Sequence, residues 1–127
     1  MKARILIVDD EPVVADTLAL IFRASGYLAD AVYSGEEALH FIDANPPSLV
    51  VTDVMMPGLN GIELAKLVKT AYPECPILLF SGNANTSGLL DAASKAGQTF
   101  EVLAKPVYPP QILNKVAIML SQSIAQA

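Results

Sequence analysis

The sequence has a single cysteine, Cys75, and a single histidine, His40. One cysteine excludes an internal disulfide. Cys75 lies between two prolines in "YPECPI" with no positioned base in view, so we interpret it as an ordinary reduced thiol. His40 falls within a predicted helix, and we interpret it as a solvated or partly packed residue rather than as such a base.

Long apolar runs and basic clusters are also missing. No segment approaches the run of about 20 apolar residues that a membrane-spanning helix needs. The apolar run in the opening "MKARILIVDD" is too short for a signal peptide. The net charge of −5 argues against non-specific binding to nucleic acid or anionic membranes. We therefore expect a soluble cytoplasmic protein that binds neither.

What the sequence does contain is an alternation of short apolar runs and longer amphipathic segments. The short runs predict strands at 4–8, 27–33, 48–53, 76–81 and 100–105. The amphipathic segments predict helices at 12–24, 34–44, 87–97 and 109–123, with a further helix beginning at 60. Pro12 suits the first turn of the first helix. Ser34 and Glu37 predict a capping box for the second helix, and Asn60 with Glu63 marks the start of the third.

Five strands alternating with five helices indicate βαβ units, and hence a parallel sheet with helices on both faces. Crossovers are nearly always right-handed, which leaves few topologies. We predict a flavodoxin-like, doubly wound α/β fold, a (βα)5 three-layer sandwich with strand order 2-1-3-4-5. The length suits one domain, predicted at 1–121, with a C-terminal tail at 122–127 and no output domain in the chain.

Polar residues stand at the carboxyl ends of four predicted strands, where doubly wound sheets carry their sites. The residues are Asp9 and Asp10, Asp53, Ser81 and Lys105. Three neighbouring carboxylates repel one another unless cations compensate their charge. Lys105 supplies one positive charge, and Mg²⁺ accepts carboxylates while keeping room for phosphate oxygens. This pattern favours a divalent cation beside these acids.

With such a cation in place, Asp53 can act as a nucleophile towards phosphorus. Ser81 and Lys105 would then bind the phosphoryl oxygens. Taken singly, Asp9 and Asp10 would only cap a helix, and the others would be ordinary turn or strand-end residues. We favour the phosphoryl interpretation because all five meet at one edge of the predicted sheet.

Four motifs follow this order along the chain: "LIVDDEP", "VVTDVMMPGLNG", "LLFSGNA" and "LAKP". Through them the chain resembles the receiver domains of two-component response regulators, the CheY-like superfamily, over residues 3–121. The resemblance implies a signalling domain rather than an enzyme. It would accept a phosphoryl group on Asp53 from a sensor histidine kinase or a histidine phosphotransfer protein. It would then change conformation to control a partner or an output domain.

The resemblance also implies roles for single residues. It assigns a ligand set for Mg²⁺ or Mn²⁺: Asp9, Asp10, Asp53 and the backbone carbonyl of Met55. Lys105 would contact the phosphoryl group, and Ser81 would be the switch hydroxyl. The peptide bond before Pro106 would be cis.

One position departs from the family pattern. Receivers usually carry an aromatic residue three positions before the lysine, and here that residue is Val102. We therefore predict signalling mainly through movement of 82–88 and its helix. In the family the face made by the fourth helix, the fifth strand and the last helix often carries the output, so a partner is expected there. The apolar residues of these two helices are either core or partly an interface, which leaves a homodimer open: Leu89, Leu90, Ile112, Val116 and Met119.

Three rival functions were weighed. A flavin- or nucleotide-binding protein would want a glycine-rich loop after the first strand, where "VDDEPVV" is acidic and has no glycine. A dehalogenase-like phosphatase would carry a second aspartate two positions after its nucleophile, where this chain has Met55. A degenerate receiver that only binds partners conflicts with the intact acid cluster, although Val102 keeps this reading open.

Overall fold

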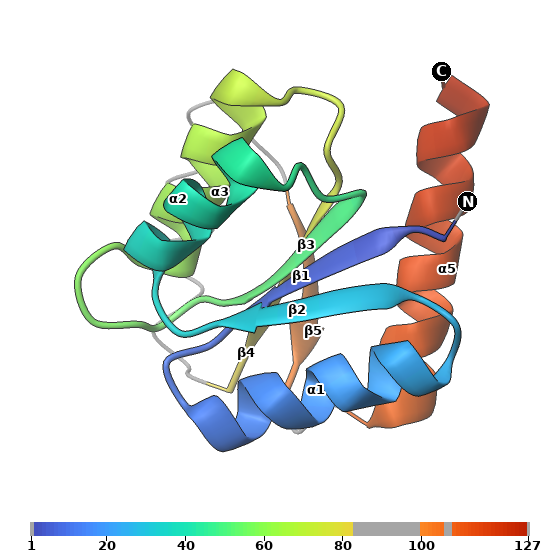
Figure 1. Cartoon of the computed structure of the whole chain (residues 1–127), viewed down its shortest axis with the longest axis horizontal. Helices are drawn as coiled ribbons and strands as arrows, with labels where there is room; N and C mark the ends of the chain where they lie inside the picture. Colours follow the sequence, from blue (N-terminus) through green and yellow to red (C-terminus); the bar gives the residue numbers. More distant parts are fainter. Residues whose placement is uncertain (1, 83–99, 106–107, 127) are drawn as a thin grey trace.

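The computed structural model of the protein describes residues 2–82, 100–105 and 108–126, with backbone only for 123–126. Its centre is a parallel five-stranded sheet (Figure 1). The strands are β1 (Arg4–Val8), β2 (Leu28–Val32), β3 (Leu49–Asp53), β4 (Ile77–Ser81) and β5 (Glu101–Ala104). Their order, β2-β1-β3-β4-β5, confirms the predicted topology. The predicted strand ends differ from the observed ones by at most one residue.

Helices cover both faces of the sheet (Figure 1). They are α1 (Pro12–Ala24), α2 (Gly35–Ala44), α3 (Gly61–Ala71) and α5 (Pro109–Gln126). Helices α2 and α3 lie on one face, and α1 and α5 lie on the other. The three-layer α/β sandwich is thus confirmed. The helix predicted at 87–97 lies outside the described residues.

Each face of the sheet has its own apolar core. Leu6 and Val8 of β1 pack in the core beneath α2 and α3, whereas Ile5 and Ile7 pack beneath α1 and α5. All four side chains are fully buried. Successive residues of a strand point to opposite faces, so a strand covered on both faces must be apolar at every position. This is why the central strands β1, β3 and β4 are mostly apolar, whereas the edge strands β2 and β5 each carry an acidic residue.

Local hydrogen bonds fix where two helices begin. At α3 the capping box is complete, because Asn60 accepts a bond from the Glu63 amide and Glu63 accepts one from the Asn60 amide. At α2 the predicted box is only half formed. Ser34 Oγ accepts from the Glu37 amide at 3.0 Å, but the Glu37 carboxylate accepts from the amide of Tyr33 at 3.2 Å instead.

The last helix contributes to the core. The side chains of Ile112, Val116 and Met119 are buried against the face that α1 covers, so these three residues are core rather than interface. Leu89 and Leu90 lie outside the described residues. Helix α5 also continues to Gln126, past its predicted end at 123.

One apolar residue of α3 lies outside the core. Leu67 is 46 % exposed. The core face is already filled by Leu64, Ala65 and Val68, which are buried. Leu67 falls beside this stripe, because each residue of an α-helix is turned by about 100° from the one before it.

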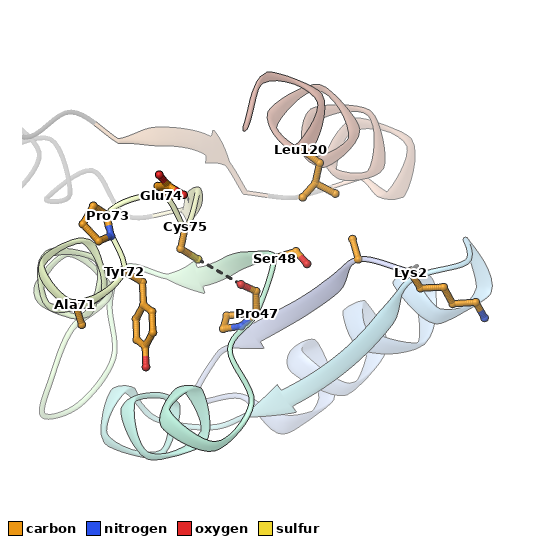
Figure 2. Close-up of a pocket in the computed structure, with 10 residues that line it drawn as sticks. Lys2, Pro47, Ser48, Ala71, Tyr72, Pro73, Glu74, Cys75 and Leu120 are labelled. Carbon is orange, nitrogen blue, oxygen red and sulfur yellow. Dashed lines mark hydrogen bonds between the residues drawn. The ribbon is translucent and has the colours of Figure 1, made fainter. Parts of the chain in front are cut away.

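The surface has a hollow of about 810 Å³ at the amino ends of the strands, the opposite edge of the sheet from Asp9 and Asp53. Figure 2 shows Leu120 of α5 on one side and the segment that follows α3 on the other. Cys75 lines this hollow, and its Sγ lies 3.9 Å from the carbonyl oxygen of Pro47. Burial raises the pKa of Cys75 to about 11. The thiol therefore stays protonated at neutral pH, as an ordinary reduced cysteine does.

Candidate functional site

Three carboxylates meet at the carboxyl edge of the sheet. Asp9 follows β1 and Asp53 ends β3, and these strands are paired neighbours, with Val8 opposite Thr52. One carboxylate oxygen from each of Asp9, Asp10 and Asp53 lies within 4.8 Å of the others. Asp9 and Asp53 are buried, and Asp10 is exposed. The structure thus brings together the three acids that the sequence singled out.

Lys105 reaches the same place from β5. Its Nζ lies 3.4 Å from Asp53 Oδ2 and 3.8 Å from Asp9 Oδ2. Its backbone amide donates to the carbonyl of Ser81 at 2.9 Å, which joins the ends of β4 and β5. Ser81 is buried at the end of β4 and pairs in register with Ala104. The Lys105 ammonium thus lies beside both buried carboxylates, and Ser81 lies on the strand next to that of Asp53.

The two buried acids resist ionisation. The pKa of Asp9 is raised to about 6, mainly by burial and further by the charge of Asp53, while a hydrogen bond from the Glu11 amide and the charge of Lys105 oppose the rise. The pKa of Asp53 is also raised, again mainly by burial, and Lys105 opposes the shift. One lysine therefore does not compensate the negative charge that this edge collects.

One oxygen atom of Asp9 has a special position. Asp9 Oδ1 accepts a hydrogen bond from the Glu11 amide at 2.9 Å. Asp9 Oδ2 is buried without a hydrogen-bond partner among the described residues. A buried carboxylate oxygen that lacks a hydrogen-bond partner among the described residues and lies beside two further carboxylates suits a hard divalent cation, which binds oxygen ligands. The donor set therefore fits Mg²⁺ or Mn²⁺.

The loop after Asp53 is held by α2, which the sequence analysis did not foresee. Glu36 Oε2 accepts a hydrogen bond from the Leu59 amide at 3.2 Å. Gly58 has φ +72° and approaches this carboxylate so closely that a Cβ would lie 2.8 Å from Oε2. Met55, the second residue of this loop, is 41 % exposed. The sequence signal was the Pro-Gly pair in "MPGLNG", which marks a tight turn.

Helix α3 begins directly against the backbone of Asp53 and Val54. The Gly61 amide donates to the carbonyl of Val54 at 2.8 Å. A Cβ on Gly61 would overlap the carbonyl oxygen of Asp53. Only glycine allows the helix to start this close to the strand end. The sequence analysis placed this residue in a helix beginning at 60 and did not foresee its steric role.

The structure describes only some of the positions that the resemblance linked to the conformational switch. Val102 stands on β5 opposite Leu79 and is 37 % exposed. Pro106, with the predicted cis peptide bond, and residues 83–88 of the segment predicted to move lie outside the described residues.

A groove of about 770 Å³ opens beside Lys105. Val13, Val14 and Ile21 of α1 line it, together with Pro109 at the start of α5. Val13 is 78 % exposed. The groove runs along these apolar side chains to Lys105 and Glu11.

The strand order and the acidic edge define a CheY-like α/β domain. The family model for the response regulator receiver domain matches residues 5–117. The chain therefore belongs to the receiver domains of two-component response regulators. None of the helices in the described ranges is long and apolar enough to cross a membrane.

Similar proteins agree with this assignment. The chain is 32% identical over 123 residues to the response regulator MprA of Mycobacterium sp. (strain KMS), covering 97% of this chain and 53% of that protein. It is 28% identical to the DNA-binding response regulator MtrA of Mycolicibacterium smegmatis, with coverage of 97% and 53%. The chain thus spans about half the length of these curated relatives.

Solved structures show the same fold. A CheY-like receiver domain protein from Methanospirillum hungatei JF-1 superimposes with a TM-score of 0.90 at 24% identity, covering all of both chains. A two-component transcriptional regulator AraC from Clostridium phytofermentans ISDg superimposes with a TM-score of 0.82 at 30% identity, covering 98% of this chain and 99% of that one.

Proposed function

We propose that this receiver accepts a phosphoryl group on Asp53 from a phosphohistidine donor, in a reaction that depends on Mg²⁺ or Mn²⁺. The observation that carries the proposal is the meeting of three carboxylates within 4.8 Å with the Lys105 ammonium 3.4 Å from Asp53. An isolated turn aspartate would need neither the acidic neighbours nor the lysine. Phosphoryl transfer would use both, since the acids would hold a divalent cation, and the cation and the lysine would offset the negative charge that the transition state spreads over the phosphoryl oxygens.

The proposed transfer assigns each residue a task. An Asp53 carboxylate oxygen forms a bond to phosphorus as the phosphorus–nitrogen bond of the donor breaks, and the imidazole leaves with that electron pair. Lys105 binds a phosphoryl oxygen, and Ser81 contacts another as the switch hydroxyl. Asp9, Asp10 and the Met55 carbonyl would hold the metal with Asp53. The bound metal would supply the positive charge that the acids and the phosphoryl group require.

The donor would be a sensor histidine kinase or a histidine phosphotransfer protein in the cytoplasm. It must bring its imidazole to Asp53, and the groove beside Lys105 supplies apolar walls from Val13, Val14 and Ile21 for that approach. The expected output is a partner or output domain on the face that includes β5 and α5. The chain would act as a signalling domain that assists its own phosphorylation and dephosphorylation, rather than as an enzyme on other substrates.

Intact-mass spectrometry after incubation with acetyl phosphate tests the proposal. We expect one added phosphoryl group that requires a divalent cation and is lost in Asp53→Asn. Acetate replaces the imidazole as leaving group, so the test is independent of any cognate kinase. A folded protein that gains no phosphoryl group from acetyl phosphate or from phosphohistidine proteins would contradict the proposal.

The second candidate is a degenerate receiver that binds partners without phosphorylation. Val102 on β5, 37 % exposed, favours it, because the usual aromatic reporter is missing from that position. Isothermal titration with Mg²⁺ distinguishes the two functions when combined with the mass measurement. Retained Mg²⁺ binding without phosphorylation would support the degenerate receiver.

A further inference from the structure

The Lys105 ammonium has a third neighbour besides the two buried carboxylates. Its Nζ lies 5.0 Å from the centroid of the Phe80 ring, over the ring face. The face of an aromatic ring is negative and attracts a cation at this distance. Phe80 is 1 % exposed, so this ring is fixed within the core. The ammonium therefore has a rigid apolar contact as well as two charged ones.

The backbone explains why Phe80 occupies this place. It pairs in register with Asp53 across β3 and β4, and its carbonyl accepts a hydrogen bond from the Val54 amide at 3.2 Å. The next residue, Ser81, accepts a hydrogen bond from the Lys105 amide. Phe80 and Asp53 thus lie on adjacent strands, Lys105 directly follows the next strand, and backbone hydrogen bonds join all three. The sheet therefore fixes the backbones from which the ring, the carboxylate and the lysine side chain extend.

The ring differs from the carboxylates in one chemical respect. Asp53 and Asp9 attract the ammonium only while their oxygens remain free and charged. Under the proposed function a cation and a phosphoryl group engage those oxygens in turn. The attraction of the ring face does not change with the state of the acids, because it comes from the ring's fixed charge distribution.

We propose that Phe80 is a positioning residue for Lys105, keeping its ammonium at the acceptor when the carboxylates are engaged. The inference rests on the proposed phosphorylation of Asp53, because the role of Phe80 is to aim the residue that binds the phosphoryl group. Phe80→Leu removes the ring but keeps an apolar side chain. We expect this variant to accept phosphoryl from acetyl phosphate about fivefold more slowly, which corresponds to about 1 kcal/mol.

Phe22→Leu is the matched control for packing. Phe22 is fully buried in the same core as Phe80, beneath α1 and α5, and its ring stacks edge-on against Tyr27. Both variants lose one buried ring from one core. Their thermal unfolding would show a similar loss of stability, whereas only Phe80→Leu is expected to slow phosphorylation. Equal rates for the two variants would overturn the inference.

A series of fluorinated phenylalanines at position 80 tests the electrostatic basis without removing the ring. One, two and three fluorine atoms weaken the negative face in steps while nearly keeping the ring's shape. We expect the phosphorylation rate to fall at each step, and to stay constant when the same series replaces Phe22. A rate that does not follow fluorination at position 80 would reduce Phe80 to a packing residue and refute its role.

Nuclear magnetic resonance separates failure of this inference from failure of the proposed function. A cation over a ring face carries an upfield shift at its neighbouring methylene protons. We expect this shift for the Hε protons of Lys105, and its loss in Phe80→Leu. If the wild-type protein is not phosphorylated, the proposed function fails, yet the shift still decides whether the ring holds the ammonium. Absence of the shift would overturn the placement itself.

Discussion

Asp9 is the residue whose surroundings least favour its own charge. Its side chain is fully buried, burial raises its pKa to about 6, and one of its oxygens has no hydrogen-bond partner among the described residues. Folding therefore works against the ionised form of this group at neutral pH. A buried acid kept under such conditions indicates a role in binding, since an apolar or amide side chain would cost less.

Asp9→Asn should move stability and metal binding in opposite directions. The amide keeps an oxygen for the Glu11 backbone bond but removes the buried charge, so the metal-free variant should unfold at a higher temperature than the wild type. Its Mg²⁺ affinity, measured by isothermal titration, should fall at least tenfold, since a charged ligand is lost. Asp30→Asn, which alters only a surface pair with Arg4 at 3.8 Å, should change neither quantity. Unchanged Mg²⁺ affinity in Asp9→Asn would contradict the proposed ligand set.

Cys75 should make the stability of the protein depend on pH. Its folded pKa is raised from 9.0 to about 11, so the folded chain holds the thiol proton more tightly than the unfolded chain does. Below pH 9 both states are protonated and the thiol's contribution to stability is complete. Between pH 9 and 11 the unfolded chain loses the proton first, so this contribution is lost as pH rises. The free energy of unfolding should therefore fall more steeply over this range in the wild type than in Cys75→Val. Parallel curves would contradict it.

At the scale of elements, the start of α3 is fixed by the acceptor strand. Gly61 allows the first turn of the helix to lie against the carbonyl of Asp53, and the capping box of Asn60 and Glu63 closes that turn. The other side of the same loop is held by Glu36 of α2. The loop after Asp53 is thus held at the starts of two helices, α2 and α3, which restrict its backbone.

Gly61→Ala tests the contact between Gly61 and the Asp53 carbonyl, because the contact decides whether the substitution stabilises or destabilises the protein. In an unconstrained helix the change would stabilise the protein by about 1 kcal/mol, because alanine favours the helix. Here the added Cβ overlaps the Asp53 carbonyl, so we expect destabilisation of about 1–3 kcal/mol instead. Chemical denaturation measures the difference. A variant as stable as the wild type would mean that α3 can shift away from the strand without cost.

The elements also show where sequence reasoning succeeds and where it stops. Strands β1 and β3 were found because burial on both faces makes them continuously apolar. The half-formed box at α2 was not foreseen, because the Glu37 carboxylate had two amides within reach, and the position of Tyr33 decided between them. The exposure of Leu67 has a similar cause. Helical spacing gives a stripe, but the neighbouring elements decide how wide a stripe is covered.

At the scale of the whole molecule, the acidic edge links metal binding to folding. The carboxylates come from β1 and β3, so the site exists only in the folded chain. A cation that binds the folded state and not the unfolded one stabilises it by RT ln(1 + [L]/Kd). We therefore expect the melting temperature to rise steadily with the logarithm of Mg²⁺ concentration above Kd. Sodium chloride at matched ionic strength is the control, since it screens surface charges without filling the site. An equal rise in both salts would refute a specific cation site.

The sequence by itself determined the layers, the strand order and the membership of the acidic edge. These follow from apolar periodicity and from the rule that parallel strands end at one edge, so Asp9, Asp53 and Lys105 could be grouped without coordinates. Only the tertiary structure decided which atoms face one another. It left one oxygen of Asp9 without a hydrogen-bond partner among the described residues, set the Phe80 ring beneath the Lys105 ammonium and placed Gly61 against the carbonyl of Asp53. Such contacts depend on the register between strands distant in sequence, which no local pattern encodes.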